Sequence, residues 1–168
     1  QPLSTFAKKY FSKRKFIKFI RQEYAIDTSI IFEKLVYNLS SGCFPGPCPG
    51  IYVEINNKKE IYLDVTLYKE YFDKDNQNSG SFKAILNDSL YQELVHLVQT
   101  CHLTNLFFPK IEAHDGQIVD FIFYYNKKEK HLKSMIPPVI VYRLMDFLNT
   151  INTKVSLTRV TPKIKLVE

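Results

Sequence analysis

The sequence predicts an α+β domain: an antiparallel sheet built from two hairpins plus flanking strands, with two helices packed on it. Two pairs of alternating apolar and polar runs, within 51–67 and 117–136, each enclose a four-residue polar loop. Apolar residues recur at helical spacing over 88–103 and 138–152. We expect two parts, a basic amphipathic N-terminal helix within residues 1–26 and a single α+β domain over residues 27–168.

The size and composition fit one globular domain. The chain has 168 residues, of which 45% are hydrophobic and 24% charged. No run of about 18 uninterrupted apolar residues is present, so the sequence predicts no membrane span. The chain does not begin with Met and shows no signal peptide. We therefore expect a trimmed fragment or a processed mature form.

The positive charge is concentrated at the N-terminus. Residues 1–22 contain no acidic residue and seven basic ones, which are Lys8, Lys9, Lys13, Arg14, Lys15, Lys18 and Arg21. The rest of the chain holds the other 16 basic residues and all 17 acidic ones, a net charge of −1. The basicity is thus no sign that the main domain binds nucleic acid, and we predict no nucleic-acid partner.

The stretch from residue 3 to residue 24, which we call the basic N-terminal segment, has the pattern of an amphipathic helix. Its apolar stripe falls at three- and four-residue spacings and comprises Phe6, Tyr10, Ile17, Ile20 and Tyr24. We expect this helix to dock on the domain with its lysines and arginines in water. The alternative is that it lies on an anionic membrane surface or a polyanion.

The first half of the domain is predicted to contain three strands and a helix. Residues 30–40 are apolar and β-branched enough for a strand. Around the polar loop 56–59, Ile51, Val53 and Ile55 alternate with Tyr52 and Glu54, and a second alternating run follows, which predicts a hairpin with one buried face. Residues 69–81 are predicted to be an exposed loop.

A helix follows this loop. It is capped by Asn87 or Asp88, and its inner face is expected to hold Leu90, Leu94, Leu97, Val98 and Cys101. Cys101 is therefore predicted to be a small buried hydrophobe and not a nucleophile. His102 is its neighbour in sequence, but adjacent helical residues do not face each other.

The second half repeats the pattern of hairpin and helix. Residues 117–125 and 130–136 are predicted strands around the polar loop 126–129. Pro137-Pro138 ends the second strand and opens a helix whose buried stripe is Ile140, Leu144, Phe147, Leu148 and Ile151. Residues 155–166 are expected to add an edge strand, weakened by Pro162.

The stretch from Gly42 to Gly50 is a tight irregular turn that holds Cys43 and Cys48. We expect a structural disulfide or a plain turn, because the two cysteines are close enough in sequence to bond. A bond across so short a loop would stabilise the fold by only about 2 kcal/mol. A redox-active pair and a metal site are the alternatives, although the Cys-x-x-Cys spacing and a second Cys/His ligand pair are absent.

Residues that could carry catalysis are scattered. The sequence has no Gly-rich phosphate loop, His-Glu-x-x-His or Gly-x-Ser-x-Gly motif, and we predict no cofactor and no metal. Asp64 and Asp120 lie within predicted strands and His114 near a turn. An enzyme site assembled from Asp64, Asp120, His114 or the cysteine turn is the alternative to a non-catalytic function.

One resemblance bears on the compartment. Cys43-Phe44-Pro45-Gly46-Pro47-Cys48-Pro49-Gly50-Ile51-Tyr52 resembles a Cys-Phe-Gly-x-Cys-Pro-x-Tyr pattern that enters a hairpin in uncharacterised domains of exported Bacteroidetes proteins. This sequence has one extra residue between the cysteines and another before Tyr52. The resemblance covers roughly residues 32–152. It implies export to the periplasm or cell envelope and an oxidised cysteine pair, and it implies no activity.

These observations predict a non-catalytic binding or structural domain of an exported bacterial envelope protein. The expected partners are another envelope protein or an anionic membrane surface, with the seven basic residues of the N-terminal segment as contacts. A deep polar pocket joining the scattered candidates would favour an enzyme, whereas an exposed aromatic patch would favour binding.

Overall fold

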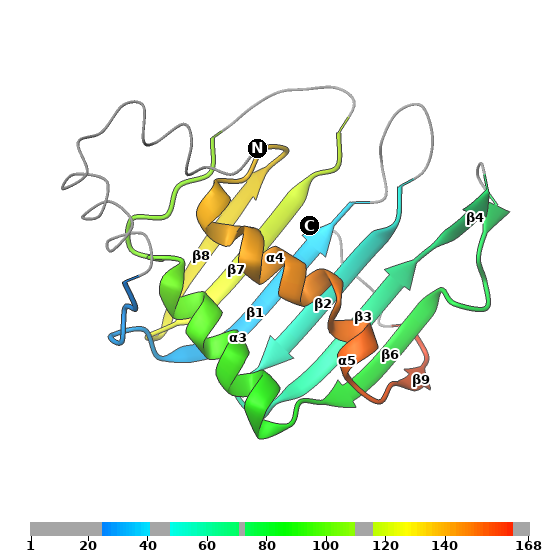
Figure 1. The fold of residues 1–168 in the computed structure, drawn as a ribbon, viewed down its shortest axis with the longest axis horizontal. Helices are drawn as coiled ribbons and strands as arrows, with labels where there is room; N and C mark the ends of the chain where they lie inside the picture. Colours follow the sequence, from blue (N-terminus) through cyan, green and yellow to red (C-terminus); the bar gives the residue numbers. More distant parts are fainter. Residues whose placement is uncertain (1–24, 41–47, 71–72, 110–115, 163–168) are drawn as a thin grey trace, which may run out of the picture.

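The protein is a mixed α+β fold with a large antiparallel sheet and a few helices (Figure 1). A computed structural model describes residues 25–40, 48–70, 73–109 and 116–162. The main sheet has seven strands in the order β8-β7-β1-β2-β3-β6-β9, and every neighbouring pair is antiparallel. A separate two-stranded sheet, β4-β5, projects beyond the main one (Figure 1).

The strands follow the predicted hairpins closely. The bounds are β1 Phe32–Leu39, β2 Gly50–Asn56, β3 Glu60–Thr66, β4 Tyr68–Glu70, β5 Asp73–Lys74, β6 Gly80–Ile85, β7 Val119–Tyr125, β8 Lys128–Ser134 and β9 Thr158–Val160. Alternation confirms the predicted buried face of the first hairpin, where Val53 and Leu63 pair across β2 and β3 and are both fully buried.

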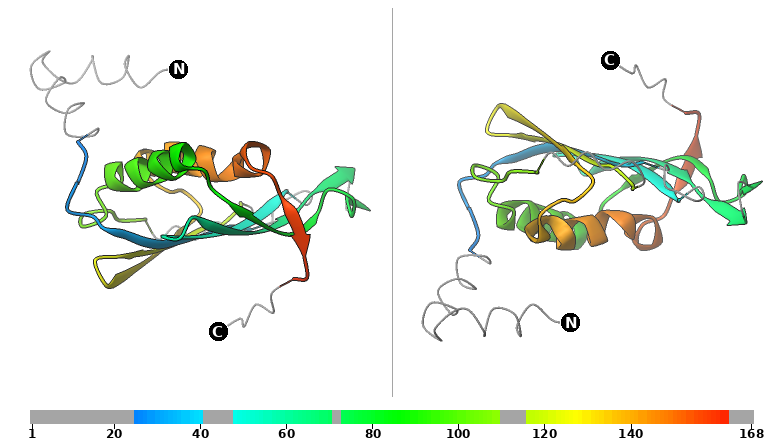
Figure 2. Two further views of the ribbon diagram at one scale, coloured as in Figure 1. Left: turned by 90° about the horizontal axis from the view of Figure 1, so that it is seen from below. Right: turned by 90° about the horizontal axis from the view of Figure 1, so that it is seen from above.

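The helices cover one face of the sheet (Figure 2). They are α3 (Asp88–Thr100), α4 (Tyr142–Asn149) and the short α5 (Ile151–Lys154), with a 3₁₀ turn, η1 (Val139–Val141), leading into α4. The Asn87 side chain caps α3 by accepting a hydrogen bond from the Leu90 amide at 2.9 Å, as predicted. None of the helices in the described ranges is long and apolar enough to cross a membrane.

The core lies between the helices and the sheet. Tyr37 and Phe121 are fully buried in the neighbouring strands β1 and β7, and their rings lie 4.8 Å apart between centroids. Tyr37 also donates a hydrogen bond to Asn149 at the end of α4, at 3.0 Å. Burial raises the pKa of Tyr37 to about 12. The tyrosine therefore serves as a neutral donor that ties α4 to the sheet.

The prediction of an exposed loop over residues 69–81 was wrong except at residues 76–78, which form an exposed turn. This stretch contains part of β4, then β5, and the start of β6, a strand that pairs with β3 over its whole length. Asp75 and Ser79, which look like loop residues, are buried. The Asp75 carboxylate accepts hydrogen bonds from the Gln77 and Asn78 amides, so polar residues here form an ordered turn between strands.

Two smaller corrections concern element ends. The loop predicted at 126–129 is a two-residue turn, because Asn126 and Lys127 both adopt positive φ, 50° and 58°, as the tight hairpin turn requires. Within the described residues 155–162, the final edge strand covers only Thr158–Val160, and it pairs with β6 over these three residues. The predicted N-terminal helix lies outside the described residues.

Candidate functional site

The face of the sheet opposite the helices carries polar and aromatic side chains. We call it the helix-free face, and it consists of the side chains that alternate with the buried ones, among them Lys34, Tyr52, Glu54, Tyr62, Asp120 and Tyr124. Figure 2 shows that both α3 and α4 lie on the other side of the sheet. Tyr62 is nonetheless buried, at 4% exposure, whereas the other named side chains are partly exposed. No described helix lies on this face, so its partly exposed side chains are candidates for recognition.

Charged and aromatic groups interlock at the centre of this face. Lys34 on β1 forms an ion pair with Glu54 on β2, with Nζ 2.9 Å from Oε1. The Lys34 ammonium also lies 5.5 Å from the centroid of the Tyr124 ring on β7. The Tyr52 hydroxyl donates to the other oxygen of Glu54 at 3.2 Å. Three adjacent strands thus hold one another's side chains in fixed positions.

Tyrosines give this face its apolar area. The rings of Tyr52 and Tyr62 meet edge to face, with centroids 6.1 Å apart. Burial, followed by the negative charge of Glu54, raises the pKa of Tyr52 far above its ordinary value. Burial, followed by the charge of Glu129, also raises the pKa of Tyr124. Both hydroxyls therefore stay protonated at neutral pH and remain hydrogen-bond donors.

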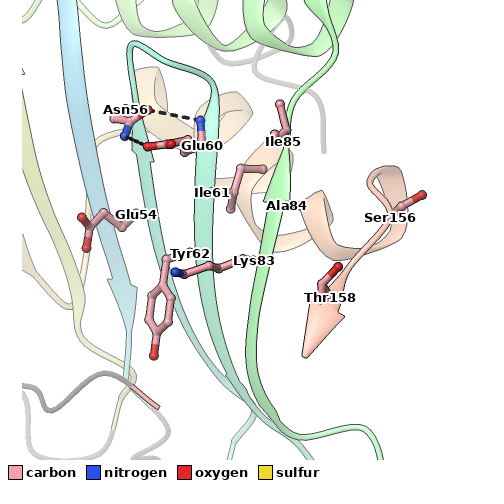
Figure 3. Close-up of a pocket in the computed structure, with 10 residues that line it drawn as sticks. All are labelled: Glu54, Asn56, Glu60, Ile61, Tyr62, Lys83, Ala84, Ile85, Ser156 and Thr158. Atoms are coloured by element: carbon pink, nitrogen blue, oxygen red, sulfur yellow. Dashed lines mark hydrogen bonds between the residues drawn. The ribbon is translucent and has the colours of Figure 1, made fainter. Parts of the chain in front are cut away.

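A cleft of about 480 Å³ opens beside this face, at the end of β6 (Figure 3). One wall comes from β2, β3 and β6, and the other comes from Ser156, between α5 and β9, and from Thr158, the first residue of β9. Figure 3 shows Ser156 and Thr158 across from β6, and Asn56 hydrogen-bonded to Glu60 at the hairpin turn. The lining residues are Glu54, Asn56, Glu60, Ile61, Tyr62, Lys83, Ala84, Ile85, Ser156 and Thr158.

The cleft exists because β9 covers only part of β6. Arg159 fastens β9 at the far end, since its guanidinium donates to the main-chain oxygens of Ser79 and Gln77 at 3.1 and 2.8 Å. Pairing stops at Lys83 opposite Thr158. In the same register Ile85 would face Ser156, but β9 begins only at Thr158.

The main chain of Ile85 points into this opening. The Leu86 amide donates to the Lys59 oxygen on the β3 side at 2.9 Å. Because main-chain groups alternate in direction along an antiparallel strand, the N–H and C=O of Ile85 point away from β3, toward the cleft. Among the described residues, no main-chain bond joins Ile85 to the opposite wall. Its side chain is 73% exposed. The cleft therefore offers a donor, an acceptor and an apolar side chain.

The scattered acidic candidates do not come together. Asp120 on β7 lies opposite Asn38 on β1, which lies opposite Tyr52 on β2, which in turn lies opposite Asp64 on β3. The two acids are therefore three strand spacings apart. At about 4.8 Å per spacing this is roughly 14 Å. Paired acids in glycoside hydrolysis lie within about 9.5 Å of each other. Asp120 instead contacts His131, with 2.7 Å between Oδ1 and Nε2.

The structure describes the state of Cys101 but does not test the predicted bond between Cys43 and Cys48. Cys101 is a free thiol that is 1% exposed, and burial raises its pKa to about 12, which confirms the prediction of a buried hydrophobe. Pairing of Cys43 with Cys48 stays a prediction, since Cys43 lies outside the described residues, as do His114 and the seven basic residues. Within the described part of the chain, no group of three or more His, Cys, Asp or Glu could hold a metal ion.

The cleft was not predicted from the sequence. Alternation did place Tyr52 and Glu54 on the face opposite the core, as found. Ile85, however, fell between a predicted loop and a predicted helix, and Ser156 belongs to a segment far away in the chain. The alternation of Ser81, Lys83 and Ile85 with Phe82 and Ala84 was the signal that could have revealed β6.

Comparisons with known proteins add no identification. No family model matches this chain, and a search of curated proteins finds no match. The case for a function therefore depends on the geometry of the helix-free face and its cleft.

Proposed function

We propose that this is a non-catalytic binding domain of an exported protein, and that the cleft at Ile85 receives an extended peptide segment of another envelope protein. The observation that carries the proposal is the open β6–β9 ladder, which directs the N–H and C=O of Ile85 into the cleft. An added strand forms main-chain hydrogen bonds to such an edge and takes its specificity from nearby side-chain pockets.

The side chains around the cleft favour a peptide with both apolar and basic residues. Ile85 is exposed and provides an apolar contact for a residue of the incoming strand. Glu60 is exposed, and its carboxylate accepts a hydrogen bond from Asn56 at 2.7 Å. A lysine or arginine of the peptide could reach this carboxylate and form a charge-assisted hydrogen bond. Lys83, on the same wall, disfavours a second basic residue beside the first.

The tyrosines of the helix-free face extend this surface. Tyr52 and Tyr124 are partly exposed, and Lys34 and Glu54 hold them in place. Tyrosine is enriched at protein interfaces because its rigid ring gives contact area at a low cost in conformational entropy. A partner seated in the cleft would therefore have a preorganised surface beside it.

Export remains part of the proposal. It is supported by the resemblance of residues 43–52 to exported Bacteroidetes domains and by a cysteine spacing that suits a short disulfide in an oxidising compartment. An enzyme built from Asp64 and Asp120 has no comparable support, because the sheet separates them.

Selection from a phage-displayed heptapeptide library on the purified full chain tests this function. We expect enrichment of peptides with alternating apolar residues and one basic residue, and calorimetry on a synthetic copy should give a measurable affinity. Ile85→Pro removes the N–H that points to the cleft while sparing the bonds to β3, so it should abolish binding. Ile85→Val keeps the N–H and should retain binding.

A Glu60→Gln variant separates charge from main-chain pairing. The substitution should lower the affinity for peptides that carry a basic residue several-fold and leave the affinity for uncharged peptides unchanged. Circular dichroism of each variant confirms that the sheet is intact. Failure to enrich any sequence, or equal binding by wild type and Ile85→Pro, would contradict the proposal.

A further inference from the structure

Most of the exposed apolar side chains among the described residues lie in three segments of the chain. Seven large hydrophobic residues in the described ranges are well exposed, and one of them is Ile85 in the cleft. The other six belong to these three segments, and they are Ile26, Ile31, Phe107, Ile136, Val139 and Tyr142. A concentration of exposed apolar groups marks an interaction site more often than single exposed residues do.

Hydrogen bonds bring two of these segments, those with Phe107 and Ile136, together at the Ser134 end of β8. The Ser134 hydroxyl donates to the Pro109 oxygen at 2.7 Å and accepts from the Ile136 amide at 3.0 Å. It thus joins the loop after α3 to the chain that leads into η1. Two residues before Pro109, Phe107 is 70% exposed, whereas Phe108 is buried against Phe121. This loop therefore turns one phenylalanine inward and the other outward.

The start of α4 completes this surface. Val139 and Tyr142 are both exposed and lie three residues apart, so they project from the same side of the helical turn. We call Phe107, Ile136, Val139 and Tyr142 the end patch. The inner side of the same turn is buried, as Val141 and Leu144 show. Val139 and Tyr142 are thus held in place by a helical turn whose other side is packed into the core.

The chain enters the described part of the structure at the other end of β8, where the Asn126 side chain in the β7–β8 turn donates to the Ser29 oxygen at 2.9 Å and accepts from the Ile31 amide at 2.7 Å. The Asp27 amide donates to the Gln99 oxygen at 3.1 Å, and the Gln99 side chain donates to the Ile30 oxygen at 3.2 Å. The first described residues are therefore fixed beside the C-terminal end of α3, from which the loop with Phe107 leads away. Figure 1 shows these residues, this loop and the start of α4 along the same edge of the molecule.

We propose that the end patch is the docking site of the chain's own basic N-terminal segment. The segment carries an apolar stripe that includes Phe6, Tyr10, Ile17 and Ile20. It joins the described residues near the β7–β8 turn, about the length of β8, or roughly 20 Å, from the patch. As a helix of 22 residues it would be about 33 Å long, enough to reach back to the patch from there. Docking buries the stripe and the patch against each other and removes both from water.

This docking also fixes where the seven positive charges point. They occupy the faces of the segment that the stripe leaves free. With the stripe against Phe107 and Tyr142, the lysines and arginines form one ridge on the outside of the molecule. The docked segment therefore displays its charge toward solvent or an anionic surface, and its apolar residues stay covered.

A single introduced tryptophan tests the docking in the full chain. The protein has no Trp, so Tyr10→Trp places a unique fluorophore in the stripe. We expect its emission maximum to be shifted to shorter wavelength, as for a buried indole. Adding Phe107→Ser and Tyr142→Ser should move the maximum to the value of a solvent-exposed indole. Adding Ile85→Ser instead, which removes an exposed apolar residue elsewhere, should leave it unchanged.

Three results would overturn the proposal. The first is solvent-exposed emission with the patch intact, which would leave the patch for another partner. The second is a blue-shifted emission that the patch substitutions do not change. The third is a blue shift that disappears on dilution, which would assign the patch to the segment of a second copy. Far-UV circular dichroism checks that the doubly substituted patch leaves the fold intact, as expected for exposed side chains.

Discussion

Replacing Leu63 by Asp places a carboxyl group at the centre of the sheet, where Leu63 is fully buried opposite Val53. Loss of the apolar side chain costs about 2–3 kcal/mol of transfer free energy. A fully buried carboxyl has a pKa raised by roughly 3 to 5 pH units, and each unit corresponds to about 1.4 kcal/mol. At neutral pH the folded state takes up the proton instead, so this second contribution is limited to about 4 kcal/mol for an unfolded pKa near 3.9. The total, on the order of 6–7 kcal/mol, is comparable to the stability of a typical domain.

The pH dependence of the stability distinguishes the cost of burying a charge from the cost of lost packing. The folded state binds the proton more tightly than the unfolded state, so the Leu63→Asp variant should regain stability as the pH falls toward the unfolded pKa near 3.9. Leu63→Asn has nearly the same shape and does not titrate, so it should lack this extra pH dependence.

Urea unfolding of both variants and wild type between about pH 4.5 and pH 7.5, followed by circular dichroism, measures the difference. The stability of Leu63→Asp relative to Leu63→Asn should increase at the acidic end. Equal pH profiles for the two variants, or a near-neutral effect of Asp, would mean that Leu63 does not face the core and that the sheet register is wrong.

Four further predictions follow from the described contacts and from the sequence. Glu60→Lys should change the free energy of unfolding by less than about 0.5 kcal/mol, whereas Glu54→Lys should cost more than about 1 kcal/mol because it removes an ion pair and a tyrosine hydrogen bond; urea titrations compare them. Cys101 should be inert to a thiol reagent at pH 8 until the protein unfolds, since burial raises its pKa to about 12. Mass spectrometry of non-reduced peptides, from protein made in an oxidising compartment, should show Cys43 bonded to Cys48. The full chain should co-sediment with anionic but not neutral vesicles at low salt, and replacing the seven basic residues of the N-terminal segment by Gln should abolish this; binding that persists at high salt would exclude an electrostatic contact.

Elements with a strong local pattern could be predicted from sequence. The alternation of residues 51–55 with their partners after the loop predicted β2 and β3 and assigned Val53 to the core and Glu54 to the other face, as found. The helical spacing of Leu94, Leu97 and Val98 likewise predicted the buried side of α3. In these elements burial follows a single period, which a sequence displays directly.

The strand β6 could not be recognised in this way. It is short, it follows a polar stretch, and its identity depends on pairing with β3 on one side and with β9 on the other. The cleft is even less accessible to sequence reasoning, because it arises where β9 stops short, at Thr158, of the end of β6. Which main-chain groups are left open is a property of register, and no pattern of side chains encodes it.

The most direct test of the proposed function is amide hydrogen exchange, measured by NMR in the free protein and with the selected heptapeptide bound. The Ser81 and Lys83 amides point toward β9 and should exchange slowly in both states, whereas the Ile85 amide should exchange rapidly in the free protein. Saturation with the peptide should slow exchange at Ile85 by at least tenfold and leave Lys83 unchanged. An Ile85 amide as protected as Lys83 in the free protein, or one that the bound peptide does not slow, would contradict strand addition at this edge.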